Sequence, residues 1–140
     1  MSAKVFIDTN ILVYAHDREH GYKQETAKRL LLNLGRENSA AVSMQVLQEF
    51  YSTVTRKLAV SIPKQEARAI VEDFAYWCVP TTPEEIKRAF QIEDAARINF
   101  WDAMIVAAAV KCGATKILSE DLNHGQTIAG IQIENPFLGQ

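Results

Sequence analysis

Acidic side chains stand at four separate points of the sequence, each beside a predicted strand or helix end. Asp8 follows the β-rich run 4–7, Glu49 lies early in a predicted helix, Asp102 opens another, and Asp121 follows a further apolar run. Carboxylate oxygens are the ligands that Mg²⁺ and Mn²⁺ prefer, and no His/Cys set points to zinc. If the four acids converge, their repulsion raises their pKa values unless cations neutralise them.

Each acid also has an ordinary structural interpretation. Asp8 and Asp102 are both typical of helix N-caps. Glu49 shares a helix face with Gln45, Ser52 and Arg56, which is typical of a solvated glutamate. Asp121 is followed by Asn123 and Gly125, as in many turns. Taken singly the acids predict little, so the hypothesis depends on their sharing one location.

The apolar pattern predicts short strands alternating with helices. Gly35 and Gly113 are expected to end two of the helices. The alternation predicts an α/β fold, a three-layer α/β/α sandwich around a mainly parallel sheet of roughly five strands. The expected strands are 4–7, 40–43, 77–79, 115–119 and 131–134, and the expected helices are 11–15, 22–34, 45–58, 63–76, 83–97 and 102–112.

The predicted sheet places the acids at one edge. Ligands of open parallel sheets bind beyond the carboxyl ends of the strands. Asp8 and Asp121 follow two such ends. Asp102 begins the helix that leads into the strand before Asp121, and Glu49 lies early in the helix after the second strand. The helix around 103–110 is apolar on every side, as expected of a helix buried against a parallel sheet.

Composition and length limit the class of protein. The chain has 140 residues, 48% of them hydrophobic and 23% charged, which favours one domain, 1–140, with a sizeable core. The longest apolar run, 103–110, is too short to cross a membrane. Residues 1–4 lead directly into a strand, so we expect no signal peptide and a cytoplasmic location. Cys78 and Cys112 are then expected to be reduced core residues, with an incidental disulfide as the minor alternative.

The net charge of −2 does not exclude a nucleic-acid partner. If the four acids are set aside as metal ligands, the sequence has 13 other acidic residues and 15 basic residues. The composition does exclude the strongly basic surface of a protein that binds through phosphate contacts alone. Basic residues around a cleft could bind RNA, although a solvated face is the commoner explanation for such residues. The candidates are Arg18, Lys23, Arg56, Lys57 and Arg97. Trp101, Phe50 and Tyr51 fit either base stacking or, more commonly, a core.

Five segments of the chain resemble the PIN domain, the fold of the VapC-like toxin ribonucleases. They occur in the family's order and span nearly the whole sequence. The segments are Val5-Phe6-Ile7-Asp8-Thr9-Asn10, Val46-Leu47-Gln48-Glu49-Phe50, Phe100-Trp101-Asp102-Ala103, Leu118-Ser119-Glu120-Asp121-Leu122 and Asn135-Pro136-Phe137.

This resemblance implies an endoribonuclease that hydrolyses RNA phosphodiester bonds with one or two Mg²⁺ or Mn²⁺ ions. It also implies a homodimer and, for a toxin, an antitoxin whose chain covers the acidic cleft. By the resemblance, Asp8, Glu49, Asp102 and Asp121 are the catalytic metal ligands, and Asn10, Ser119 and Glu120 support them or position the substrate.

Other functions remain open at this level. A PIN-like module that binds protein or RNA with little catalysis would have the same fold. An RNA-processing enzyme or a DNA nuclease outside a toxin system would have the same acids. A phosphatase with an aspartyl nucleophile usually has Asp-x-Asp after the first strand, where this chain has Asp8-Thr9-Asn10. A receiver domain needs an acceptor Asp where this chain has Val79-Pro80-Thr81.

Overall fold

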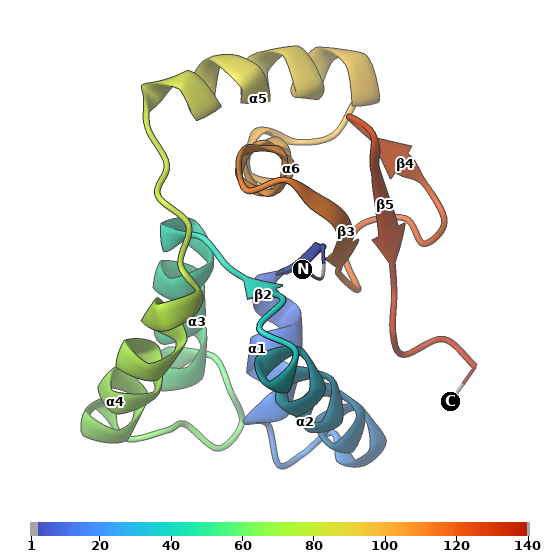
Figure 1. Cartoon of the computed structure of the whole chain (residues 1–140). Coiled ribbons are helices and arrows are strands. Elements are labelled where there is room, and N and C mark those ends of the chain that lie inside the picture. The colour runs from blue at the N-terminus through green and yellow to red at the C-terminus, as the bar shows by residue number, and fades with distance from the viewer. Residues whose placement is uncertain (1–2, 140) are drawn as a thin grey trace.

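A five-stranded sheet lies between two layers of helices in this computed structural model, which describes residues 3–139 (Figure 1). The strand order is β2-β1-β3-β5-β4, and every neighbouring pair is parallel except β4 and β5. The predicted α/β fold with a mainly parallel sheet is confirmed. The strands are β1 (Lys4–Ile7), β2 (Ala40–Ala41), β3 (Ala114–Leu118), β4 (Thr127–Ile128) and β5 (Ile131–Glu134).

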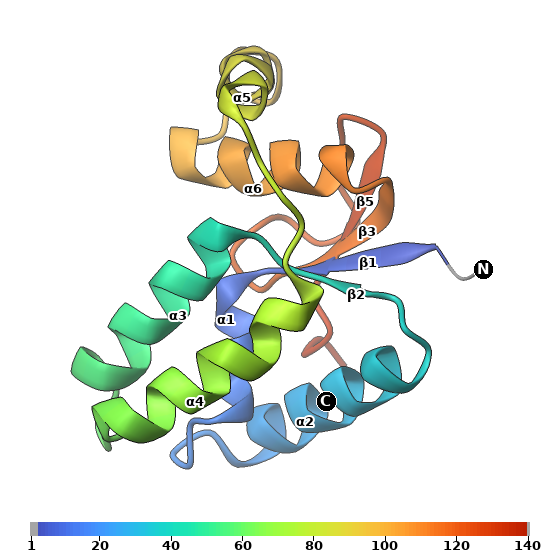
Figure 2. The same ribbon diagram turned by 60° about the vertical axis from the view of Figure 1, so that its left-hand side comes forward.

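The helices divide between the two faces of the sheet. Figure 2 shows α5 and α6 on one face and α1 to α4 on the other. Each face of a parallel sheet is apolar, so both need such a cover. The helices are α1 (Thr9–Ala15), α2 (Gly21–Arg36), α3 (Met44–Arg56), α4 (Lys64–Phe74), α5 (Pro83–Ala96) and α6 (Phe100–Lys111), with a short 3₁₀ helix η1 (Ala75–Trp77) after α4.

Helix α6 is enclosed on two sides, which explains its uniformly apolar sequence. It packs against β3 and β5 on one side and against α5 on the other (Figure 1). Its alanines allow this close approach, and Ala103, Val106 and Ala107 are fully buried. Gly113 ends the helix with φ +73°, as expected. The enclosed helix holds its first turn, which carries Asp102, at the same end as the carboxyl edge of the sheet.

The expected helix end at Gly35 is wrong. Gly35 lies inside α2, which continues to Arg36, and the left-handed residue beyond the helix is Asn38, with φ 54°. A Cβ at Gly35 would lie 3.4 Å from Cζ2 of Trp77, which is a close but ordinary van der Waals contact, so packing does not require a glycine here.

Two expectations for strands also need correction. Residues 77–79 form only an isolated bridge between Val42 and Cys78, because η1 occupies the preceding residues and Pro80 follows. The short strand β4 was not expected. Its two residues are too few to give an alternating pattern, and it pairs with β5 through a turn at Ala129 and Gly130, where both φ angles are positive.

Further expectations concern the cysteines and the membrane. Cys78 and Cys112 are free thiols, and both are half-buried rather than core residues. Within residues 3–139, no helix is long and apolar enough to cross a membrane.

Candidate functional site

The ends of β1 and β3 are tied together where the first acid emerges. Ile7 pairs with Leu118, and the Asp8 amide donates to the Leu118 carbonyl at 3.0 Å. The Asp8 carboxylate turns back over α1 as its N-cap and accepts from the Thr9 amide at 2.7 Å. Its other oxygen accepts from the Ser119 hydroxyl at 2.7 Å. Asp8 is therefore both a helix cap and a buried carboxylate at the sheet edge.

Ser119 organises the turn that follows β3. It is fully buried, and its Oγ accepts from the amides of Asp121 at 3.1 Å and Leu122 at 3.3 Å while donating to Asp8. Asn10 joins the same turn from α1. Its Nδ2 donates to Asp121 Oδ2 at 3.2 Å, and its Oδ1 accepts from the Glu120 amide at 3.0 Å. These two polar residues thus hold Asp121 beside Asp8.

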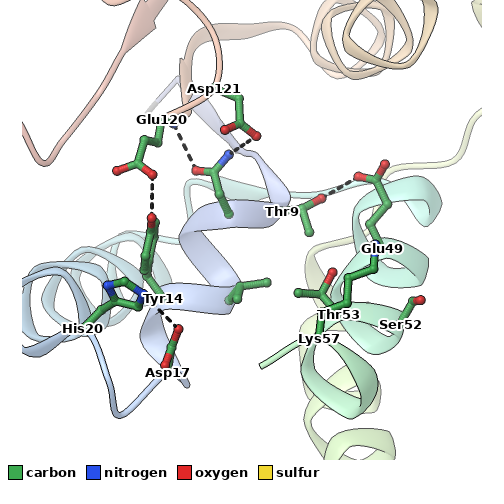
Figure 3. Close-up of a pocket in the computed structure, with 12 residues that line it drawn as sticks. Thr9, Tyr14, Asp17, His20, Glu49, Ser52, Thr53, Lys57, Glu120 and Asp121 are labelled. Atoms are coloured by element: carbon green, nitrogen blue, oxygen red, sulfur yellow. Dashed lines mark hydrogen bonds and ion pairs between the residues drawn. The ribbon is translucent and has the colours of Figure 1, made fainter. Parts of the chain in front are cut away.

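Glu49 reaches the site from α3. Its Oε1 accepts from the Thr9 hydroxyl at 2.7 Å (Figure 3), and its Oε2 accepts from Gln45 at 3.3 Å. The Gln45 amide also donates to the Trp101 carbonyl at 3.1 Å and so links α3 to the first turn of α6. Sequence reasoning assigned no role to Thr9 or Gln45. The available signal was Gln45 standing one turn before Glu49 on the same helix face.

Asp102 lies in the first turn of α6 but does not cap it. Asn99 is the N-cap, accepting from the Asp102 amide at 2.8 Å, and its Nδ2 donates to the Asp102 carboxylate at 2.9 Å. Asp102 is therefore not the N-cap itself, but its place in the first turn and its hydrogen bond from Asn99 also favour an acid at this position. The adjacent Trp101 is 63% exposed, so its assignment to the core is wrong, whereas Phe50 is fully buried as expected.

Glu120 points away from the other acids, toward α1 and α2. It accepts from the Tyr14 hydroxyl (Figure 3) and forms an ion pair with Lys23, both at 2.5 Å. Burial acts to raise the pKa of Glu120, but these two donors outweigh it and lower the pKa. Among the three expected supporting residues, Asn10 and Ser119 contact the acids, and Glu120 belongs to a separate pair.

The four acids share one electrostatic environment. Burial, with the nearby charges of Asp121 and Asp102, raises the pKa of Asp8 to about 6 despite hydrogen bonds that lower it. Burial likewise raises the pKa of Asp102, and the charges of Asp121 and Glu49 add to the shift. Raised pKa values of neighbouring carboxyls are typical of functional sites, because they record a charge that the fold alone does not neutralise.

The donor chemistry of this cluster fits a hard divalent cation, since every acid offers oxygen and none is paired with Lys or Arg. The side chains are not, however, gathered into a metal site. Among residues 3–139, no three His, Cys, Asp or Glu side chains lie close enough together to form a ready metal cluster. The expectation that the carboxylates surround one common centre is not met here, because hydrogen bonds hold them toward Thr9, Gln45, Asn99 and Ser119.

A cavity of about 500 Å³ opens beside the acids. Asn10, Glu49 and Asp121 line one end of it, and it continues between α1 and α3 (Figure 3). Its volume lies within the roughly 300–1,000 Å³ usual for small-molecule sites. The arrangement therefore offers a group of carboxylates at the edge of a space that a substrate can enter.

Comparison with known proteins agrees with this architecture. A family model described as the PIN domain matches residues 5–127. No curated protein matches the chain by sequence. Solved structures are also similar at low identity, which shows the fold alone, and three of them are described below.

The first is a toxin–antitoxin complex from Klebsiella pneumoniae, with TM-score 0.68 and 19% identity, covering 97% of this chain and 98% of that one. The second is DNA-bound VapBC from Salmonella typhimurium, with TM-score 0.66 and 22% identity, covering 96% and 99%. The third is the sarcin–ricin loop-cleaving toxin VapC20 of Mycobacterium tuberculosis, with TM-score 0.59 and 20% identity, covering 84% and 92%.

Proposed function

The chain belongs to the PIN domain family, and from that premise we propose that it is a divalent-metal-dependent endoribonuclease. Asp8, Glu49, Asp102 and Asp121 would hold one or two Mg²⁺ or Mn²⁺ ions. The observation that carries the proposal is the shared elevation of the pKa values of Asp8 and Asp102 by burial and by the neighbouring acids. A bound cation would relieve this unfavourable charge, so these residues favour metal binding over a merely structural role.

The reaction is hydrolysis of an RNA phosphodiester to a 5′-phosphate and a 3′-hydroxyl. A divalent cation at the site would supply a water of lowered pKa and offset the charge on the phosphate. The contribution of the chain's own residues is to orient the acidic side chains. Ser119 fixes the Asp8 carboxylate, Asn10 fixes Asp121, and Thr9 fixes Glu49, each through a hydrogen bond. No covalent nucleophile is needed.

The test is cleavage of a mixed structured RNA by the purified chain in Mg²⁺, in Mn²⁺ and in EDTA. Asp102→Asn keeps the size of the side chain and removes a charged ligand, so cleavage should be lost while the circular dichroism spectrum is retained. Asp94→Asn is the matched control, because Asp94 is an exposed acid on α5. Cleavage by Asp102→Asn at the wild-type rate would contradict the assignment. DNA of the same sequence, tested in parallel, decides between RNA and DNA as substrate.

A second candidate function is supported by the absence of a ready metal cluster among residues 3–139. On this alternative the chain is a PIN-like module that binds protein or RNA with little catalysis. Intact RNA under every metal condition, together with measurable partner binding, would favour the module over the nuclease.

The wider role we propose is that of a cytoplasmic toxin, paired with an antitoxin and assembled as a homodimer of single-domain chains. Solved toxin–antitoxin complexes of the same fold support the pairing. Induced expression in bacteria should arrest growth, and Asp102→Asn should relieve the arrest. Light scattering should give twice the 15.7 kDa chain mass, and unfolding should follow one cooperative transition.

A further inference from the structure

The cavity beside the acids extends well beyond them. From the end lined by Asp121 and Glu49 it runs between α1 and α3 toward the turn before α2. Figure 3 shows Asp17 and His20 on one side of this lower part and Ser52, Thr53 and Lys57 on the other. We call this region the lower cavity, defined by Asp17, His20, Ser52, Thr53 and Lys57. Among these five residues, only Lys57 was among the basic residues expected around a cleft.

The charges around the lower cavity leave one cation without a partner. Glu120 at its border is paired with Lys23 at 2.5 Å. Asp17 accepts from the Glu19 amide at 3.0 Å and lies 3.5 Å from His20 Nε2. Lys57 is exposed, and it forms no salt bridge with any residue in the described range 3–139. The lower cavity therefore presents an available positive charge.

The α3 wall of the lower cavity is also rich in free hydroxyls. The Ser52 and Thr53 side chains are half-buried, and neither has a hydrogen-bond partner among the residues that the structure describes. Glu49, Thr53 and Lys57 follow one another at a spacing of four residues, so they lie along one helix face. Lys57 is two turns from Glu49, about 12 Å along the helix axis. A phosphate bound by Lys57 is therefore not the one held at the acids but a neighbour of it.

The aromatic side chain in the cavity is not available for stacking on a base. The Tyr14 ring forms T-shaped contacts with His20 and Phe137, each with ring centroids 5.1 Å apart. Lys23 lies over the ring, with its Nζ 4.8 Å from the centroid. Base-specific binding in single-stranded RNA depends largely on stacking against open aromatic faces. The groups available in the lower cavity are the Lys57 ammonium and the Ser52 and Thr53 hydroxyls, which can bind the sugar–phosphate backbone.

We propose that the lower cavity binds the RNA backbone next to the cleaved bond, with Lys57 as the ligand of a neighbouring phosphate. Ser52 and Thr53 donate to that phosphate or to its ribose. The inference rests on the proposed ribonuclease function and adds a binding residue to it. Because phosphate contacts position a nucleic acid without reading its sequence, this subsite holds any RNA equally well. Selection of the target must come from other contacts.

The test measures binding of a short fluorescent single-stranded RNA by anisotropy, with Mg²⁺ present and in the Asp102→Asn background so that the RNA stays intact. Lys57→Ala removes one phosphate contact. For single-stranded RNA, each phosphate contact contributes about 0.7 to the slope of log affinity against log salt concentration. Relative to 1 M salt, one such contact therefore raises the affinity at 50 mM salt roughly eightfold. We expect that loss of affinity and that decrease in slope, equally for two RNAs of different sequence. Lys57→Arg should restore both.

Lys111→Ala is the matched control, since Lys111 is an exposed lysine in the last turn of α6, at the end opposite Asp102. It should leave affinity and slope unchanged. If Lys57→Ala behaves like Lys111→Ala, or if its effect differs between the two RNA sequences, the inference is overturned. Failure of the parent protein to bind RNA also overturns it. The nuclease proposal is decided separately by cleavage with the wild-type chain, so the two failures are distinguishable.

Discussion

A buried carboxylate that is ionised at neutral pH destabilises the fold that holds it, and Asp8 is such a group. It is 5% exposed, and burial is the largest cause of its raised pKa. Asp8→Asn removes the charge while keeping the size of the side chain. The expected result is that this variant of the metal-free protein is more stable than the wild type at neutral pH, although it has lost a proposed ligand.

The direction follows from proton binding. The unfolded chain releases the Asp8 proton at the ordinary pKa of 3.8, whereas the folded chain holds it up to about pH 6. Between these values the folded state binds more protons, so its free energy of unfolding falls as pH rises and levels off above. At about 1.36 kcal/mol per pKa unit the full loss is about 3 kcal/mol. About 1 kcal/mol of it is lost by pH 4.5 and about 2 kcal/mol between pH 4.5 and 7.

The assay is urea unfolding in EDTA at these two pH values. The variant exchanges one carboxylate acceptor for an N–H donor facing Thr9 or Ser119, which costs about 1 kcal/mol at either pH. We therefore expect the variant to match the wild type at pH 4.5 and to exceed it by about 2 kcal/mol at pH 7. Added Mg²⁺ should stabilise the wild type and not the variant. A stability difference that is the same at both pH values would refute a buried, ionised Asp8.

Three further substitutions test other parts of the structure. Ser119→Ala removes the hydrogen bond to Asp8 and the acceptor of two amides. The free energy of unfolding should therefore fall by about 2–3 kcal/mol, and cleavage should weaken. Unchanged urea unfolding would contradict the role of Ser119 in the turn. Ala129→Gly relieves a left-handed residue with φ 51° in the β4–β5 turn and should add about 1 kcal/mol without altering cleavage. Trp101→Ala should change the free energy of unfolding by less than about 0.5 kcal/mol, because the ring is 63% exposed. Phe50→Ala should lower it by about 3–5 kcal/mol, because that ring is fully buried. Similar losses for the two variants would show that the ring of Trp101 is buried.

The sequence carried enough information to predict the parallel sheet and the edge at which the acids lie. Runs of apolar residues mark β1 and β3, and the residues after parallel strands must emerge at one edge, so Asp8 and Asp121 could be placed together. The role of Thr9 could not be predicted, because its hydrogen bond to Glu49 depends on how α3 packs against α1. The contact between Gln45 and Glu49 lies within α3 and was open to prediction from their spacing of four residues.

Other features were set by packing between segments distant in the sequence. A helix that is apolar all round gives no indication of which residue faces solvent, so the exposure of Trp101 was missed. A glycine is typical of a helix end, but α2 continues through Gly35 to Arg36, and the left-handed residue is Asn38. Strand β4 depends on a two-residue turn and on β5 as its partner, neither of which leaves a periodic signal.

The strand order also has a consequence for the nascent chain on the ribosome. The central strand β3 is translated after β1, β2 and all six helices, yet it joins β1 to β5. Until β3 joins the sheet, α6 lacks the strands that cover it, and apolar surface exposed in this way promotes aggregation. Ser119 and Asp121 are translated later still. A growing chain therefore carries Asp8, Glu49 and Asp102 before the turn that aligns them, so the acid site is assembled only after Asp121 has been translated.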